Sequence, residues 1–404
     1  MFVCLYLRSA SIRFCAAALL LFGGAVAAGP IAQVATLQDA SLVVADNGRL
    51  VIADRPDRLL IPASTMKLVT ALAAIERWGL SHRFETTFYQ DASGRLWIRG
   101  GGDPYLVSEE VDRMVTGLSA AGVRQVSGIG LDASLFGTAV EIPGRSSSNN
   151  PYDAPVTALA VNFNTVSVVV SGSRVDSAEL QTPLTATAQK IGRRLGAGKH
   201  RVNLGNETAA LNHFGEVMRA KLKKGGIRVD GSVQVGVKPA SARLVYTHRN
   251  SKTLETVVTN MLKYSTNFVA NDLFLLLGER NGRASMGQSQ QALERWARKT
   301  FGWRNARIED GAGLSRGNRL SGRQLLDVLE RLAPYRNLLP QQDKQPSVRA
   351  KTGTLRGVSA YAGFVRRAGD WLPFSLMINE PVAYGFRLQV ASELARSPAL
   401  ASGR

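Results

Sequence analysis

Cysteine is almost absent from this chain of 404 residues, which contains only Cys4 and Cys15. Both lie within the first thirty residues, so the remainder of the chain has no thiol. This absence excludes disulfide bonds, a cysteine nucleophile and a thiolate metal site from that remainder. Its stability must come from packing, and its length is sufficient for two or three domains with full cores.

Histidine is also scarce, and the four residues show no spacing typical of a metal site; they are His82, His200, His213 and His248. Without cysteine partners a zinc site is not expected, and ordinary surface histidines are a better interpretation than members of a Ser-His-Asp triad. Gly100-Gly101-Gly102 lacks the Lys-Ser/Thr that follows a phosphate-binding loop, so it predicts a tight turn. We therefore expect neither a metal nor a cofactor.

Apolar runs long enough to span a membrane are missing after the N-terminus. Residues 1–13 carry two arginines and no acid, residues 14–22 are apolar, and Ala25-Val26-Ala27 supplies small residues for cleavage. This layout predicts a secretory signal peptide over 1–27. A transmembrane anchor is the alternative, but the apolar core is shorter than the roughly 20 residues of a span and is followed by Gly23-Gly24. We expect an exported, periplasmic protein.

Acidic residues are few, 31 against 50 basic ones, and the formal net charge is +19 at pH 7. Such a chain attracts polyanions. An exported protein rarely meets nucleic acid, so we expect no nucleic-acid partner and favour peripheral contact with anionic wall polymer or a membrane surface. Because the charge is spread evenly, solubility alone is the other interpretation.

The hydrophobic patterning after the signal changes twice, and it divides the chain into residues 28–81, 82–245 and 246–404. The first segment predicts short strands and a buried helix at about 64–78, and the last predicts helices followed by strands and a closing helix. The middle segment alternates like strands, with short helices near 111–121 and 213–222. We expect an α/β fold in which an antiparallel sheet, built from both ends of the chain and flanked by helices, is interrupted by a mainly β inserted domain.

Three short motifs occur in order: Ser64-Thr65-Met66-Lys67, then Ser265-Thr266-Asn267, then Lys351-Thr352-Gly353. The first two often arise by chance when alone. Their order and setting carry the prediction, because this set is typical of penicillin-binding proteins and class A β-lactamases.

Each motif has a chemical reason. Residues three apart on a helix share a face, so Lys67 can reach Ser64 and act as the base that a hydroxyl nucleophile needs. Burial and a neighbouring cation such as Lys351 lower the pKa of a lysine and make it a competent base. Ser265 is expected to pass a proton to the leaving amine, and Asn267 to hold Lys67 and the substrate amide. Backbone N–H groups of Ser64 and Thr354 are the expected oxyanion hole.

Four flanking stretches closely resemble the class C low-molecular-mass penicillin-binding proteins: residues 61–67, 101–104, 310–316 and 351–355. The similarity covers nearly the whole mature chain. It implies a penicillin-recognising (β-lactamase/transpeptidase-like) domain interrupted by inserted domains. It also implies cleavage of the terminal D-Ala of peptidoglycan stem peptides, or of D-Ala–diaminopimelate cross-links, through an acyl-enzyme on Ser64, with β-lactams as inhibitors.

The same resemblance indicates substrate-binding residues. Thr352, Gly353 and Thr354 belong to the strand that would hold substrate, and Arg316 matches a family arginine that can bind a substrate carboxylate, with Arg356 as a weaker candidate. Tyr152 matches an aromatic residue that in several members follows an aspartate gripping the stem-peptide amine. No acid precedes Tyr152 in this sequence, although Asp153 follows it.

Two other functions stay open at this point. A serine β-lactamase or esterase would use the same Ser64 and Lys67 but hydrolyse the acyl-enzyme quickly. A non-catalytic peptidoglycan-binding protein would need none of the five motif residues to be intact. Carboxypeptidase and endopeptidase activity differ only in the leaving group, so the sequence does not separate them.

Overall fold

The structure is a computed structural model that describes residues 29–137, 140–342 and 345–396. The predicted signal peptide lies outside these residues. No helix within the described part of the chain is long and apolar enough to cross a membrane.

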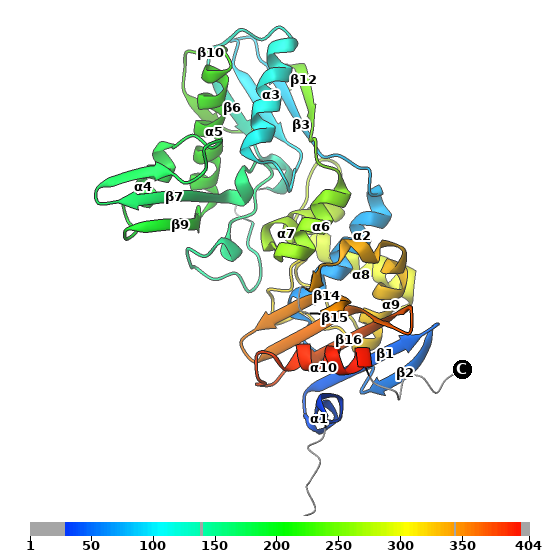
Figure 1. Ribbon diagram of the computed structural model, residues 1–404. Coiled ribbons are helices and arrows are strands. Elements are labelled where there is room, and N and C mark those ends of the chain that lie inside the picture. The colour runs from blue at the N-terminus through cyan, green and yellow to red at the C-terminus, as the bar shows by residue number, and fades with distance from the viewer. Residues whose placement is uncertain (1–28, 138–139, 343–344, 397–404) are drawn as a thin grey trace, which may run out of the picture.

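A six-stranded antiparallel sheet joins the two ends of the chain (Figure 1). Its order is β13-β14-β15-β16-β1-β2, so the N-terminal hairpin lies beside the last strand. The strands are β1 Ala40–Asp46, β2 Arg49–Asp54, β13 Gln341–Gln342, β14 Gln345–Leu355, β15 Val358–Arg367 and β16 Asp370–Ile378. This arrangement confirms the expected α/β class and the sheet drawn from both termini.

Helices cover both faces of this sheet, because alternate side chains of a strand point to opposite faces. Leu42 and Val44 of β1 join the core under α1 (Pro30–Thr36) and α10 (Phe386–Arg396), whereas Val43 and Ala45 join the larger core on the other face. That larger core contains the five remaining helices of this part of the chain: α2 Met66–Trp78, α6 Leu254–Tyr264, α7 Asn267–Leu277, α8 Met286–Phe301 and α9 Gly322–Leu332.

The central helix of the site is α2, in which every residue from Met66 to Ile75 is buried. Its many small alanines allow neighbouring helices to approach closely, and it ends at Gly79, whose φ of +75° suits glycine. The predicted helix start at 64 differs from the structure in one respect. Residues Ala63–Thr65 form a 3₁₀ turn, η1, in which Ala63 has a left-handed φ of +46°.

Between α2 and α6 the chain forms a second body with its own sheet, in the order β11-β6-β4-β3-β12 (Figure 1). The strands are β3 Glu85–Gln90, β4 Leu96–Gly100, β6 Ile129–Asp132, β11 Val233–Val235 and β12 Arg243–Arg249. Helices α3 (Ser108–Ala120) and α5 (Glu207–Lys224) are longer than the sequence pattern suggested, so this region holds more helix beside its strands than we expected. The limits of the three segments remain predictions.

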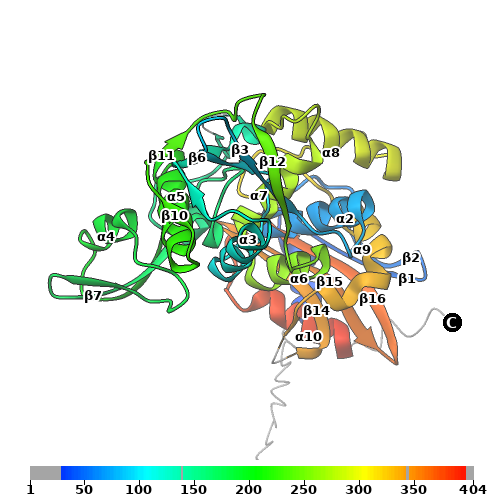
Figure 2. The ribbon, with the colours of Figure 1, turned by 90° about the horizontal axis from the view of Figure 1, so that it is seen from above.

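A small lobe extends from this second body and is seen at the left of Figures 1 and 2. It consists of the strands β7 Thr165–Ser171, β8 Arg174–Ser177 and β9 Gly198–Asn203 with the short helix α4 Ala186–Gly192. A separate apolar cluster, which includes Val166, Val168 and Val202, stabilises the lobe.

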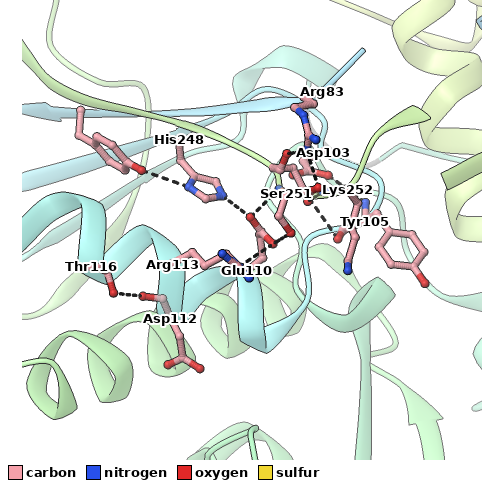
Figure 3. Close-up of polar contacts among 12 residues, drawn as sticks. Arg83, Asp103, Tyr105, Glu110, Asp112, Arg113, Thr116, His248, Ser251 and Lys252 are labelled. Atoms are coloured by element: carbon pink, nitrogen blue, oxygen red, sulfur yellow. Dashed lines mark hydrogen bonds and ion pairs between the residues drawn. The ribbon is translucent and has the colours of Figure 1, made fainter. Parts of the chain in front are cut away.

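A buried polar network fixes the junction between the two bodies (Figure 3). Glu110 of α3 accepts hydrogen bonds from His248 Nε2 at 2.8 Å and from the backbone N–H and hydroxyl of Ser251, both at 2.7 Å. Asp103 accepts a 2.6 Å hydrogen bond from Asn250 Nδ2. Because these carboxylates lie in the second body and hold the segment that returns to α6, they orient it against the catalytic helices.

Candidate active site

Ser64 and Lys67 meet at the start of α2, where the 3₁₀ turn and the helix place their side chains together. Lys67 Nζ lies 3.0 Å from Ser64 Oγ, 2.7 Å from Asn267 Oδ1 and 2.8 Å from the carbonyl oxygen of Ala312. Lys67 is completely buried. Burial, together with the Lys351 cation, holds the pKa of Lys67 well below its usual value, although Asp310 opposes this shift.

The lowered pKa of Lys67 favours a neutral amine, and a neutral amine can make all three contacts. A neutral amine has two N–H groups and one lone pair. Asn267 Oδ1 and the Ala312 carbonyl oxygen can only accept, so they take the two N–H groups. The lone pair is then left facing the Ser64 hydroxyl, which is the geometry of a general base.

The Ala312 carbonyl is held in place by a tightly bonded loop. Asn271 Oδ1 accepts hydrogen bonds from the backbone N–H groups of Gly311 (2.9 Å) and Ala312 (3.2 Å), and Asp310 accepts others from Ala312 and from Leu314. These contacts fix the position of the Ala312 carbonyl oxygen beside Lys67. Asn271 and Ala312 were missed by sequence reasoning, because a backbone acceptor and a helical asparagine have no motif of their own.

Glycine is required where this loop crosses the Ser64 turn. Gly313 has a φ of +79°, and a Cβ atom there would lie 1.8 Å from the carbonyl oxygen of Ala63. Strand β14 approaches the same turn almost as closely, since a Cβ at Gly353 would lie 2.9 Å from the Pro62 carbonyl oxygen and 3.1 Å from the Ser64 nitrogen. The glycine of the Lys-Thr-Gly motif therefore allows β14 to lie against the nucleophile.

Lys351 of β14 supplies the second buried cation of the site. Its side chain is only 2% exposed, and its Nζ donates to the carbonyl oxygen of Thr352 at 2.7 Å. Burial, with a further contribution from the Arg387 cation, lowers the pKa of Lys351 to about 7. Lys351 can thus be protonated near neutral pH. Its positive charge then disfavours protonation of the neighbouring Lys67.

Arg387 of α10 is a residue of the site that no sequence motif indicated. It is 6% exposed and donates from one guanidinium nitrogen to the Gly353 carbonyl oxygen at 2.8 Å and to Thr354 Oγ1 at 2.7 Å. Its Nε is buried without a partner among the described residues. Arg387 therefore orients the end of the Lys-Thr-Gly strand from the face opposite α2.

We expect Arg387→Met to move the alkaline limit of activity to higher pH. A protonated Lys351 attracts an anionic substrate, so activity falls as pH rises through the Lys351 pKa of about 7. Removing the Arg387 cation raises that pKa, so activity falls at a higher pH. Loss of the hydrogen bond to Thr354 also lowers the plateau of kcat/KM, by roughly tenfold. A pH profile of kcat/KM tests this, with Arg387→Lys as the control that keeps the charge; an unshifted alkaline limb contradicts it.

Ser265 and Asn267 are separated by the junction of α6 and α7. Ser265 is the left-handed C-cap of α6, with a φ of +56°, and Asn267 is the first residue of α7. The structure brings Asn267 to Lys67, whereas the Ser265 hydroxyl makes no hydrogen bond to another described residue. A proton-transfer role for Ser265 stays a prediction.

Of the predicted substrate-binding residues, Arg316 and Arg356 are exposed and adjacent, since the Arg316 guanidinium donates to the Arg356 carbonyl oxygen. Tyr152 is 54% exposed, and its carbonyl oxygen accepts a 3.1 Å hydrogen bond from Asn267 Nδ2. Asp153 accepts from the Ser146 N–H at 3.0 Å and from the Ser148 hydroxyl at 2.5 Å, so it holds its own loop.

The described residues offer no comparable cluster of side chains for another kind of catalysis. Gly313–Gly317 has the Gly-x-Ser-x-Gly spacing of a hydrolase elbow, but Ser315 donates its hydroxyl to Glu309 and lies in the loop held by Asp310. Within the described ranges, no group of three or more histidine, cysteine, aspartate or glutamate side chains could hold a metal ion.

Several known proteins are similar to this chain in sequence and fold. The family model described as D-Ala-D-Ala carboxypeptidase 3 (S13) matches residues 31–194, 197–346 and 334–394. A D-alanyl-D-alanine carboxypeptidase of Actinomadura sp. (strain R39) is 28% identical over 79% of this chain and 73% of its own length. The D-alanyl-D-alanine carboxypeptidase DacB of Haemophilus influenzae is 25% identical over 82% of this chain and 83% of its own. The crystal structure of penicillin-binding protein 4 (dacB) from H. influenzae covers 89% of this chain and 96% of that one, with 21% identity and a TM-score of 0.73.

Proposed function

This chain belongs to the D-Ala-D-Ala carboxypeptidase 3 (S13) family of serine peptidases, and on that premise we propose that it hydrolyses the terminal D-Ala-D-Ala bond of peptidoglycan stem peptides through an acyl-enzyme on Ser64. The observation that carries the assignment is the position of Lys67. Its amine lies between the Ser64 hydroxyl and two oxygens that can only accept hydrogen bonds.

Acylation begins when Lys67 removes the hydroxyl proton of Ser64. The Oγ atom attacks the carbonyl carbon of the penultimate D-Ala, and the backbone N–H groups of Ser64 and Thr354 stabilise the oxyanion. The C–N bond then breaks, and the proton passes through Ser265 to the amine of the departing D-Ala. A water molecule, deprotonated by Lys67, hydrolyses the ester and restores Ser64.

The leaving residue carries a carboxylate, and the cationic side of the site suits it. Lys351 provides the buried charge, and Thr352 and Thr354 lie on the same strand. Arg316, exposed beside the turn after β14, adds a cation at the rim. These groups bind the carboxylate that distinguishes a C-terminal D-Ala from an internal residue.

The rival functions have less support. A β-lactamase would share Ser64 and Lys67 and differ in the rate of deacylation, whereas the relatives that this chain matches are D-alanyl-D-alanine carboxypeptidases. A non-catalytic binding protein does not account for a completely buried Lys67 aligned on Ser64. Cleavage of D-Ala–diaminopimelate cross-links uses the same acyl-enzyme and is included in the proposal as a second activity.

The proposed place of action is outside the cytoplasmic membrane, in the periplasm, where peptidoglycan lies. The signal-like residues 1–27 and the net charge of +19 support export and peripheral contact with anionic wall or membrane surfaces. β-Lactams are the expected inhibitors, since they acylate the same serine.

Product analysis tests the function directly. We expect the purified enzyme to release free D-Ala from a synthetic stem pentapeptide, and to convert a cross-linked muropeptide dimer to monomers if it is also an endopeptidase. Liquid chromatography with mass spectrometry measures both. Rapid turnover of benzylpenicillin without D-Ala release would instead identify a β-lactamase.

A further inference from the structure

Beside the catalytic site, two adjoining hollows form one polar groove along the small lobe. Their volumes are about 450 Å³ and 730 Å³, and they share lining from Ser147, Ser148, Gly205 and Asn206. The first also contacts the segment at 141–146, and the second runs between the end of β9 and the helices α4 and α5. In Figures 1 and 2 the lobe of β7, β9 and α4 projects from the rest of the molecule.

The loop at 144–153 connects this groove to the catalytic residues. At one end, Gly144 packs on the Leu314 carbonyl, since a Cβ there would lie 2.5 Å from that oxygen. At the other end, the Tyr152 carbonyl oxygen accepts the hydrogen bond from Asn267. Ser147 and Ser148 of the same loop line both hollows, so one loop contacts both the groove and the residues around Lys67.

The wall of the groove is rigidly bonded. Asn203 Nδ2 donates to the carbonyl oxygens of Ser148 (2.8 Å) and Asn150 (2.6 Å). Arg145 donates to the carbonyl oxygens of Asp153 (2.7 Å) and Gly205 (2.6 Å). The end of β9 and the loop therefore form a preformed polar surface rather than two independent loops.

Several exposed side chains line the groove without using their polar groups inside the protein. Neither Lys190 nor Arg194 makes a hydrogen bond or ion pair through its side chain with any residue in the described ranges, and Ser147, Thr208 and Asn212 are likewise uncommitted. Lys190 lies in the last turn of α4 and Arg194 two residues after its end, and both line the second hollow. The first hollow is lined by one carboxylate, Glu141, and one cation, Arg145, so the two cations without a partner among the described residues lie in the second hollow.

We propose that this groove binds the part of peptidoglycan on the acyl side of the scissile bond, with Lys190 and Arg194 on a stem-peptide carboxylate and the serine and asparagine side chains on amide and acetamido-sugar groups. The inference rests on the proposed function. In the proposed mechanism the leaving D-Ala faces Lys351 and Thr354, whereas the loop that lines the groove is bonded to Asn267 through the Tyr152 carbonyl oxygen, so we assign the acyl-side chain to the groove. A flexible polar polymer with amides, hydroxyls and spaced carboxylates matches this lining.

The test compares a long and a short substrate. The long one is a disaccharide pentapeptide, and the short one is an N-acylated dipeptide-D-Ala that ends before the groove. For the double variant Lys190→Ala/Arg194→Ala, we expect the ratio of kcat/KM on the long substrate to that on the short one to fall by about tenfold or more, because two charge-assisted contacts are lost. The matched control is Lys223→Ala/Lys224→Ala, which removes two exposed lysines from the end of α5 and is expected to leave the ratio unchanged.

The outcomes separate this inference from the function on which it rests. An unchanged ratio in the groove variant, or an equal fall in the control, overturns the groove assignment even if the wild type releases D-Ala. Failure of the wild type to form an adduct with benzylpenicillin or to cleave either substrate overturns the proposed function instead. As an independent readout, a catalytically inactive Ser64→Ala protein should bind the disaccharide pentapeptide more tightly than the same protein with the two groove substitutions, as measured by calorimetry.

Discussion

Ser64→Ala is expected to abolish covalent binding of benzylpenicillin and to lower D-Ala release by on the order of 10⁴-fold or more, because removal of a covalent nucleophile leaves only binding and oxyanion stabilisation. The fold should persist. Among the described residues Ser64 Oγ has one hydrogen-bond partner, Lys67, and the loss of that bond costs about 1 kcal/mol of stability. Intact-mass spectrometry after incubation with the drug, followed for hours, measures the adduct, and thermal unfolding measures the stability.

The matched control is Ser81→Ala, which removes an exposed serine just beyond α2 and should acylate like the wild type. A penicilloyl adduct on Ser64→Ala would place the nucleophile elsewhere. The time course of the wild type is equally informative. A stable adduct agrees with a DD-peptidase, and rapid loss of the adduct with drug turnover agrees with a β-lactamase.

Lys67→Met should slow acylation by about 10³-fold, within the usual contribution of a general base, while Ser64 remains present. Methionine fills a similar volume but has no basic lone pair. The Asn267 Oδ1 and Ala312 carbonyl oxygen lose their shared donor, which costs about 1–3 kcal/mol for each acceptor left unsatisfied. The apolar methionine suits this completely buried position, which partly offsets this cost, so acylation should fall far more than stability.

Lys221→Met is the matched control for this substitution. Lys221 is another buried lysine, 4% exposed and ion-paired with Asp112 at 2.6 Å on α3, within the second body. We expect its replacement to lower the melting temperature without changing the acylation rate of the folded protein. The general-base assignment is wrong if Lys67→Met acylates within tenfold of the wild type under conditions where it is folded.

Local features of the fold could be predicted because they depend on neighbours in the chain. The strands show apolar side chains at every second residue, and α6 shows them every three to four residues. Both repeats can be seen directly in the sequence. The spacing of Ser64 and Lys67 is of the same kind, since three residues along one turn place both groups together. Predictions based on short segments were weakest in the inserted region, where α5 proved to be 18 residues long.

Contacts between residues far apart in the sequence were decided by tertiary packing. The base Lys67 receives its partners from Asn267 and from Ala312, which lie 200 and 245 residues further along the chain. The motif that contains Asn267 can be recognised in the sequence. The role of the Ala312 carbonyl oxygen cannot, because every residue has a carbonyl oxygen. Asp153 shows the same limit, since the sequence only places an acid after Tyr152, and the fold shows that this carboxylate holds its own loop.

The sequence by itself therefore determined the order of the three motifs and the sheet built from both ends, and it predicted the nucleophile and its base, because each depends on local spacing or on a motif that resembles a family. Only the tertiary structure decided that Arg387 lies behind the Lys-Thr-Gly strand and that Gly313 and Gly353 must lack side chains. Only the structure showed that the loop at 144–153 lines a groove along the small lobe. The physical reason is that burial, close approach and the pKa of a buried lysine are set by atoms that meet only after the chain has folded.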